Sequence, residues 1–145
     1  MKTIYTIGFT RKTLQQFIER LRAADVHEVI DIRLRNTSQL AGWSKCPDVA
    51  YLLAEGFGIH YEHHLEFAPT ADLLDQYTRA RDWSAYEARF NQLLADRRPE
   101  REAQTLLMKE GVCLLCTEPQ ADRCHRRLVA EYLRRLQPEL EIRHL

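Results

Sequence analysis

The sequence has 145 residues, and its 21 Lys and Arg residues are balanced by 21 Asp and Glu residues, so the formal net charge is zero at pH 7. This balance argues against a general nucleic-acid coat, a polybasic membrane binder and an acidic tail protein, because each depends on an excess of one charge. Hydrophobic residues make up 45% and charged residues 29% of the chain, values typical of a folded protein. The length predicts a single domain over residues 1–145.

The composition also bears on location and ligands. The longest apolar run covers residues 112–116, so we expect no membrane-spanning segment and no membrane partner. The first residues lack the apolar stretch of a signal peptide, which predicts a cytoplasmic protein whose four cysteines remain thiols. All but four of the cationic residues are arginine, whose planar group binds carboxylates and phosphates through two hydrogen bonds. A GC-rich genome is the rival explanation of this bias.

The predicted elements begin with a strand over residues 3–9 that ends at Gly8. Thr10 is expected to cap the helix that follows, because apolar residues then recur with helical spacing. A second strand is predicted over residues 28–33, followed by a polar loop over residues 36–39. The remaining predicted elements are a helix over 48–55, a strand over 59–63, helical segments from 69 to 109 with breaks near Asp82 and Pro99, a strand over 112–116, a helix from Asp122 that ends before Pro138, and a strand over 141–145.

Strands that alternate with helices predict an α/β fold of three layers, in which a mainly parallel sheet of four to five strands carries helices on both faces. In such sheets, ligands bind beyond the carboxyl ends of the strands. Polar residues gather at the predicted strand ends, where the candidate site residues are Gly8, Thr10, Asp31, Arg33, Arg35, His63, Cys116 and Glu118. The pattern therefore predicts a site at one edge of the sheet.

Three of the four cysteines lie close together in the sequence. Cys113 and Cys116 have a spacing found in zinc sites, and Cys124 and His125 follow them. On a strand, however, Cys113 and Cys116 point to opposite faces, and the two leucines between them are typical of a core strand. We therefore predict no metal site, and we expect Cys113 to be a small buried hydrophobic residue.

Cys116 and Glu118 lie together at the exit of the predicted strand. If the last helix starts at Asp122, its first turn holds Cys124, His125 and Arg126. Backbone N–H groups and the helix dipole favour an anion in that turn and lower the pKa of a thiol. An arginine there either faces water or binds an anionic partner, and the sequence leaves both alternatives open.

Several candidates also have a purely structural interpretation. His63 and the histidine after it point opposite ways on a strand, and a surface histidine beside the nearby glutamates is as compatible with the pattern as a ligand-binding one. Asp31 and Arg33 share a strand face, so they can simply form a buried or half-buried salt bridge. Trp83 and Tyr132 fit apolar helical patterns and are expected to pack in the core rather than to stack on a ligand.

The most specific motif is C-x-E-x5-C-H-R, at residues 116–126 directly after a predicted strand. Together with the segments at residues 5–10, 31–33, 36–42, 58–61 and 67–70, this motif resembles the family known as domain of unknown function 488. The resemblance spans nearly the whole chain and implies a three-layer α/β domain, with no particular reaction. The family pattern covers Gly8, Asp31, Arg33, Cys116, Glu118, Cys124, His125 and Arg126.

The leading functional hypothesis is an enzyme, a hydrolase or transferase, that acts on a small anionic substrate of phosphorylated, nucleotide-like or nucleic-acid-derived character. Its catalytic residues are expected among Glu118, Cys116, Asp31, Cys124 and His125. Its ligand-binding residues are expected among Gly8, Thr10, Arg33, Arg35, Arg126 and His63. The sequence contains no Gly-rich phosphate loop, so hydride transfer and P-loop chemistry are disfavoured and the cofactor is left open.

Two alternatives belong to other functional classes. A binding or sensing module for an anionic ligand or nucleic acid would use the arginines that gather after the second strand and around the start of the last helix. A thiol redox sensor would use Cys116 and Cys124, and it requires the two sulfurs to lie within disulfide reach. The oligomeric state is left open.

Overall fold

The computed structural model describes residues 2–37 and 42–145 and contains a five-stranded sheet in which every pair of neighbouring strands is parallel. The strand order is β3-β2-β4-β1-β5. The strands are β1 (Thr3–Gly8), β2 (Glu28–Asp31), β3 (His60–His63), β4 (Val112–Cys116) and β5 (Glu141–His144). The helices are α1 (Leu14–Ala23), α2 (Asp48–Tyr51) with a π-helical continuation (Leu52–Gly56), α3 (Ala71–Ala80), α4 (Trp83–Arg97), α5 (Glu100–Leu107) and α6 (His125–Leu136), with short 3-10 turns at Gly42–Ser44 and Leu65–Phe67.

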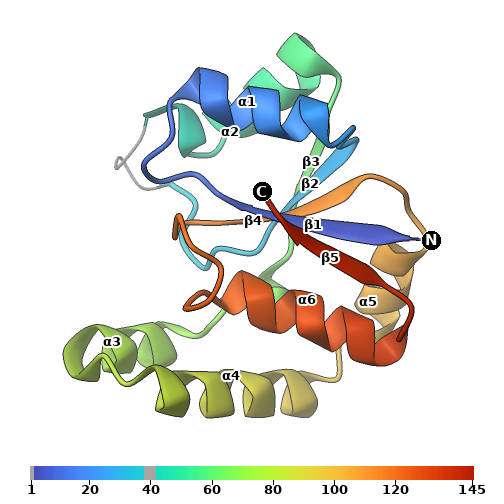
Figure 1. The fold of residues 1–145 in the computed structure, drawn as a ribbon. Helices are drawn as coiled ribbons and strands as arrows, with labels where there is room; N and C mark the ends of the chain where they lie inside the picture. Colours follow the sequence, from blue (N-terminus) through green and yellow to red (C-terminus); the bar gives the residue numbers. More distant parts are fainter. Residues whose placement is uncertain (1, 38–41) are drawn as a thin grey trace.

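Helices cover both faces of the sheet, which confirms the predicted three-layer α/β fold (Figure 1). One face packs against α1 and α2, and the other packs against α4, α5 and α6. Strand β4 contributes to both cores in alternation: Cys113 and Leu115 join the core beneath α1, while Leu114 and Cys116 join the core beneath α6. Cys113 and Cys116 therefore lie on opposite faces, as their spacing on a strand predicts.

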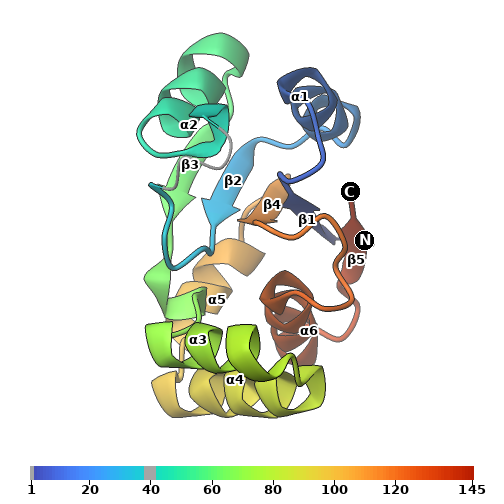
Figure 2. The same cartoon turned by 90° about the vertical axis from the view of Figure 1, so that its left-hand side faces the viewer.

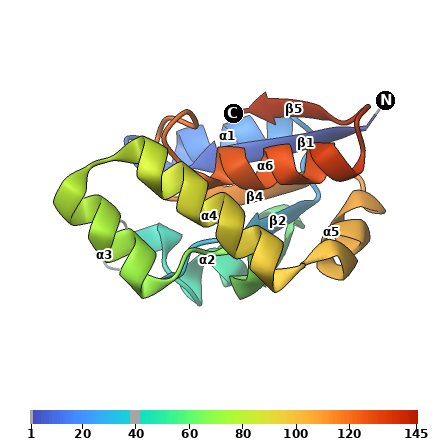
Figure 3. The same cartoon turned by 90° about the horizontal axis from the view of Figure 1, so that it is seen from below.

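The central strands β4 and β1 are neighbours from which the chain departs to opposite faces. After β1 the chain enters α1 on one face, and after β4 it enters α6 on the other, where α6 contacts both strands (Figure 3). In open parallel sheets, such a reversal opens a crevice at the carboxyl ends of the two strands. The topology therefore brings the segments after β1 and β4 to the same edge of the sheet.

Two helix starts differ from the sequence-based predictions. Helix α1 is capped by Thr13, whose side chain and that of Gln16 form a reciprocal capping box, so the expected cap at Thr10 is wrong. The Oγ1 of Thr10 instead donates a hydrogen bond to the carbonyl of Thr117 at 2.6 Å. Helix α6 begins at His125, after the extended residue Cys124, and the expected start at Asp122 is wrong.

The helical region over residues 69–109 consists of the three helices α3, α4 and α5, which begin after Thr70, Asp82 and Pro99. The predicted breaks near Asp82 and Pro99 are confirmed. Helices α3 and α4 lie side by side at the outer edge of the α6 layer (Figure 2).

The polar loop predicted over residues 36–39 lies partly outside the described residues. Within the described ranges, the helices are too short or too polar to cross a bilayer.

Candidate functional site

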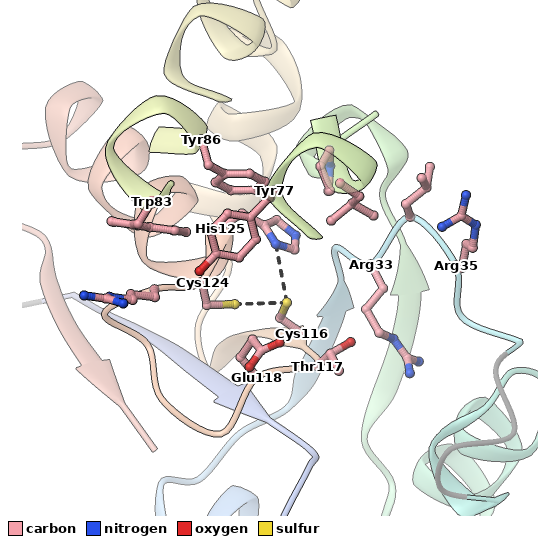
Figure 4. Close-up of a pocket in the computed structure, with 14 residues that line it drawn as sticks. Arg33, Arg35, Tyr77, Trp83, Tyr86, Cys116, Thr117, Glu118, Cys124 and His125 are labelled. Atoms are coloured by element: carbon pink, nitrogen blue, oxygen red, sulfur yellow. Dashed lines mark hydrogen bonds between the residues drawn. The ribbon is translucent and has the colours of Figure 1, made fainter. Parts of the chain in front are cut away.

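A pocket of about 330 Å³ lies at the carboxyl ends of β2 and β4 and extends to α3, α4 and the start of α6 (Figure 4). Figure 4 shows the rings of Tyr77, Trp83 and Tyr86 on one side of this pocket and the sulfurs of two cysteines on the other. The lining residues are Arg33, Leu34, Arg35, Pro69, Leu74, Tyr77, Trp83, Tyr86, Cys116, Thr117, Glu118, Arg123, Cys124 and His125. Most of this wall is apolar, and its reactive or charged groups are two thiols, an imidazole, three arginines and the carboxylate of Glu118.

Cys116 is the last residue of β4 and is only 4% exposed. Its Sγ lies 3.4 Å from Nδ1 of His125, and the Nε2 of the same ring lies 2.7 Å from the carbonyl oxygen of Ile32. A carbonyl oxygen accepts hydrogen bonds, so the proton of the neutral ring belongs on Nε2. Nδ1 is then unprotonated and faces the thiol, where it can accept the Cys116 proton.

The second sulfur of the site belongs to Cys124, whose Sγ donates a hydrogen bond to Sγ of Cys116 at 3.0 Å. Burial raises the pKa of Cys116, but the hydrogen bond from Cys124, the backbone N–H of Thr117 and the charge of Arg126 outweigh burial and leave this pKa below its ordinary value. Burial and the adjacent sulfur of Cys116 raise the pKa of Cys124 well above its ordinary value. Cys116 is therefore the member of the pair whose thiolate gains the hydrogen bond from the other sulfur.

Arg126 is buried beneath the loop that joins β4 to α6. Its guanidinium donates to the hydroxyl of Thr6 and to the carbonyls of Glu118 and Pro119. Its side chain is only 1% exposed and does not line the pocket. Since its donors are directed at the loop, Arg126 holds the segment after Cys116 in place, which is neither of the two roles that the sequence left open for it.

Gly8 and Thr10 anchor the same loop from the end of β1. A Cβ atom on Gly8 would lie 1.6 Å from the carbonyl oxygen of Glu118, so the loop occupies the space of a side chain. The backbone N–H of Thr10 also donates to the carbonyl of Thr117, at 3.2 Å. Neither residue lines the pocket, so both position the loop that carries Thr117 and Glu118.

Asp31 and Arg33 form a buried ion pair, which confirms the structural alternative for these two residues. The Arg33 side chain donates to both carboxylate oxygens of Asp31, at 2.9 and 2.8 Å, and also to the carbonyl of Ser44. Tyr61 donates a further hydrogen bond to Asp31. Burial opposes the charge of Arg33, but the hydrogen bond to Asp31 raises its pKa above the ordinary value. The guanidinium is turned away from the sulfurs (Figure 4).

The histidine pair at the end of β3 does not line the pocket. The ring Nε2 of His63 lies 2.6 Å from the carbonyl oxygen of Arg33. The neighbouring His64 lies 2.7 Å from Glu62 and 2.8 Å from Glu66. The interpretation of a histidine beside the nearby glutamates is therefore confirmed for His64, and His63 supports the backbone after β2.

Sequence reasoning missed part of the pocket wall. Trp83 was expected in the core, and it does stack on Tyr86 with a ring separation of 5.1 Å, but both rings also line the pocket. Arg123 also lines this pocket, as Arg35 does, although the sequence pattern gives no indication of it. Both arginines are exposed, and neither makes a hydrogen bond or ion pair within residues 2–37 and 42–145. The spacing of Trp83 and Tyr86 was visible in the sequence, but their position opposite Cys116 depends on how α4 packs.

Three ligand atoms at the base of the pocket are grouped as a metal would require. The Sγ atoms of Cys116 and Cys124 and a ring nitrogen of His125 lie within 4.8 Å of one another. Two thiolates and an imidazole are a donor set that suits Zn²⁺. A second group, Glu28, His60 and Glu62, is more exposed, and Glu28 already pairs with Lys109 at 2.9 Å. The absence of a metal remains a prediction.

Comparison with known protein families identifies a match. A family model described as Domain of unknown function DUF488 matches residues 13–133, which include the whole C-x-E-x5-C-H-R segment. The family assignment is thereby confirmed, while the segment at residues 5–10 lies outside the matched range. No curated protein and no solved structure matches the chain.

Proposed function

We propose that this chain, which belongs to the family described as Domain of unknown function DUF488, is an enzyme that acts on a small anionic substrate through the thiol of Cys116. The observation that carries the proposal is the hydrogen-bonded series from Cys116 through His125 to the carbonyl of Ile32, at the base of a pocket. A thiol beside an imidazole whose tautomer is fixed by a third group is the arrangement of an activated nucleophile. An isolated structural thiol needs none of these contacts.

The pocket wall supports the anionic substrate class. Arg35 and Arg123 come from different segments and are free to bind a phosphate or carboxylate within the part of the chain that the structure describes. Tyr77, Trp83 and Tyr86 offer ring faces and edges to a planar group. A volume of about 330 Å³ lies at the lower end of small-molecule pockets. Phosphorylated and nucleotide-like compounds combine an anion with a body of this size.

The proposed reaction is hydrolysis of a phosphate ester in two steps. Nδ1 of His125 takes the thiol proton of Cys116, the sulfur attacks phosphorus, and the ester P–O bond breaks as the leaving oxygen takes the proton from His125. Water then attacks phosphorus while the exposed carboxylate of Glu118 accepts one of its protons. The S–P bond breaks, phosphate leaves, and the proton returns to the sulfur. Asp31 has no proton-transfer role here, because it holds Arg33.

The proposal is tested with a panel of nucleoside phosphates, sugar phosphates and an aryl phosphate, by measuring released phosphate. We expect turnover by the wild-type chain, loss of turnover in Cys116→Ser, and a reduced rate in Glu118→Gln. Cys113→Ala is the matched control, because Cys113 lies on the other face of β4. Equal turnover by the wild type and Cys116→Ser would remove Cys116 from the reaction.

A binding module for the same anionic ligands is the second candidate, because the free arginines and the aromatic wall need no chemistry to hold a ligand. This alternative predicts binding without turnover, and equal affinity for the wild type and Cys116→Ser. If the ligand is a nucleic acid, affinity rises as salt falls, since phosphate contacts release counterions. A mobility shift that is absent at low salt for both single and double strands would exclude nucleic acid.

A further inference from the structure

The pair of sulfurs at the base of the pocket has a second chemical capacity. We propose that Cys116 and Cys124 form a reversible disulfide when a hydroperoxide enters the pocket, and that this modification removes the Cys116 thiol from catalysis. The first part rests on the geometry of the two cysteines alone. The second part, the loss of turnover, rests on the function proposed above.

The geometry meets the condition that a redox pair requires. The two Sγ atoms are 3.0 Å apart, so they need to approach by about 1 Å to reach the bond length of a disulfide. Cys116 ends β4 and Cys124 precedes the first residue of α6 in an extended conformation. Both sulfurs point into the same space (Figure 4), so the bond forms without bringing distant segments together.

The loop between the cysteines is anchored at residues 117–119, close behind Cys116. Arg126 donates hydrogen bonds to the carbonyls of Glu118 and Pro119, and Thr10 donates to the carbonyl of Thr117. Because these contacts bind carbonyl oxygens rather than the sulfurs, they persist when a disulfide forms. The modification changes the hydrogen bond between Cys116 and His125 while leaving the loop anchored.

The chemistry assigns different roles to the two thiols. The thiolate of Cys116 attacks the terminal oxygen of the hydroperoxide, the O–O bond breaks, and the sulfenic acid of Cys116 forms while an alcohol leaves with the thiol proton. The sulfur of Cys124 then attacks this sulfenic acid, the S–O bond breaks and water leaves. The two thiols are oxidised by two electrons in total, and the hydroperoxide is reduced to alcohol and water.

The positions of the other two cysteines restrict the disulfide to Cys116 and Cys124. Cys113 is fully buried on the opposite face of the sheet, and Cys46 lies outside the pocket. Cys116 and Cys124 both line the pocket and are therefore accessible to a small oxidant that enters it. The lowered pKa of Cys116 agrees with its role as the first thiol to react.

The test treats the reduced chain in a Cys113→Ala background with hydrogen peroxide and follows free thiols and peptide masses. Trypsin cleavage after Lys109, Arg123 and Arg126 separates Cys116 from Cys124, so a linked pair of peptides identifies their disulfide. We expect the loss of two free thiols per chain, and full recovery with dithiothreitol. A link to Cys46, or oxidation of Cys116 without loss of the Cys124 thiol, would overturn the inference.

The informative variant is Cys124→Ser, which removes the second sulfur but keeps a hydrogen-bond donor beside Cys116. In this variant we expect Cys116 to proceed to the sulfinic acid, a gain of two oxygen atoms that dithiothreitol does not reverse. The same sulfinic product at the same rate in chains with Cys124 would contradict a resolving role for Cys124. Turnover measured after peroxide treatment separates the two proposals. If the disulfide forms and turnover stays normal, Cys116 is not the reacting group of the proposed enzyme. If both thiols stay free and turnover stays normal, the disulfide proposal is overturned.

Discussion

Cys113 and Cys116 lie three positions apart on the same strand, yet the two faces of the sheet give them different chemistry. Cys113 packs against the α1 layer with no exposed area, and burial raises its pKa above the ordinary value. Cys116 is nearly as buried, but the hydrogen bond from Cys124 and the backbone N–H of Thr117 lower its pKa. Burial by itself therefore makes a thiol inert, and reactivity depends on the hydrogen-bond donors that a face supplies.

The largest expected effect is the difference in alkylation rate between the two thiols. Iodoacetamide should modify Cys116 at least about 10³-fold faster than Cys113, because Cys113 becomes accessible only when the chain unfolds. Peptide mass spectrometry of a time course in native buffer measures both rates. Comparable alkylation rates would contradict the difference in accessibility and thiol pKa between Cys113 and Cys116.

The next effect tests the contact between β1 and the loop after β4. Gly8→Ala places a Cβ atom 1.6 Å from the carbonyl oxygen of Glu118, so the loop has to move. We expect a loss of about 3 kcal/mol in the free energy of unfolding, a typical cost of severe overpacking, together with slower alkylation of Cys116. Gly56→Ala is the matched control, because its Cβ meets only a side-chain carbon of Leu52 at 3.7 Å. Urea unfolding compares the two variants, and equal stability would contradict the tight contact.

A smaller effect separates the arginine that supports the loop from an arginine of the pocket. Arg126→Met leaves the carbonyls of Glu118 and Pro119 without their buried donor, so the free energy of unfolding should fall by about 2 kcal/mol. Arg35→Met removes an exposed side chain, so unfolding should be unchanged while affinity for the anionic ligand falls. Urea unfolding and ligand titration of both variants measure this division. A loss of stability in Arg35→Met together with a loss of ligand affinity in Arg126→Met would contradict this assignment of the two arginines.

The smallest effect concerns the hydrogen bond between the two sulfurs. Loss of the Cys124 donor in Cys124→Ala should raise the pKa of Cys116, since the thiolate loses a hydrogen bond. Less thiolate is then present, and the alkylation rate at pH 7 should fall by about tenfold. Cys124→Ser keeps a donor and should lie close to the wild type. A pH series of alkylation rates gives the answer, and identical profiles for the alanine and serine variants would show that the donor is irrelevant.

Local patterns were sufficient for much of the fold. The alternation of strands and helices, the two faces of β4 and the breaks at Asp82 and Pro99 follow from periodicity and residue type. Helix starts were less certain, because more than one residue can cap a helix. Thr10 has the right side chain for a cap, but its hydroxyl is used by the carbonyl of Thr117, a contact between segments more than a hundred positions apart.

The candidate site shows the same division. The motif C-x-E-x5-C-H-R directed attention to Cys116, Cys124 and His125, and the structure brings these three side chains together. The motif could not reveal that Arg126 turns inward to the loop, because that depends on the position of the loop over Gly8. The aromatic wall on α3 and α4 was also beyond local patterns, since it depends on how those helices pack.

The sequence by itself determined the α/β class, the family and the segment that carries the thiols, because these depend on residue order and local spacing. Tertiary structure alone decided which arginines line the pocket, which histidine nitrogen faces the thiol and how close the two sulfurs lie. Those features come from contacts between β1, β2, β4 and α6, elements separated by tens of residues in the chain. Such contacts are set when the whole sheet packs, so no single segment contains them.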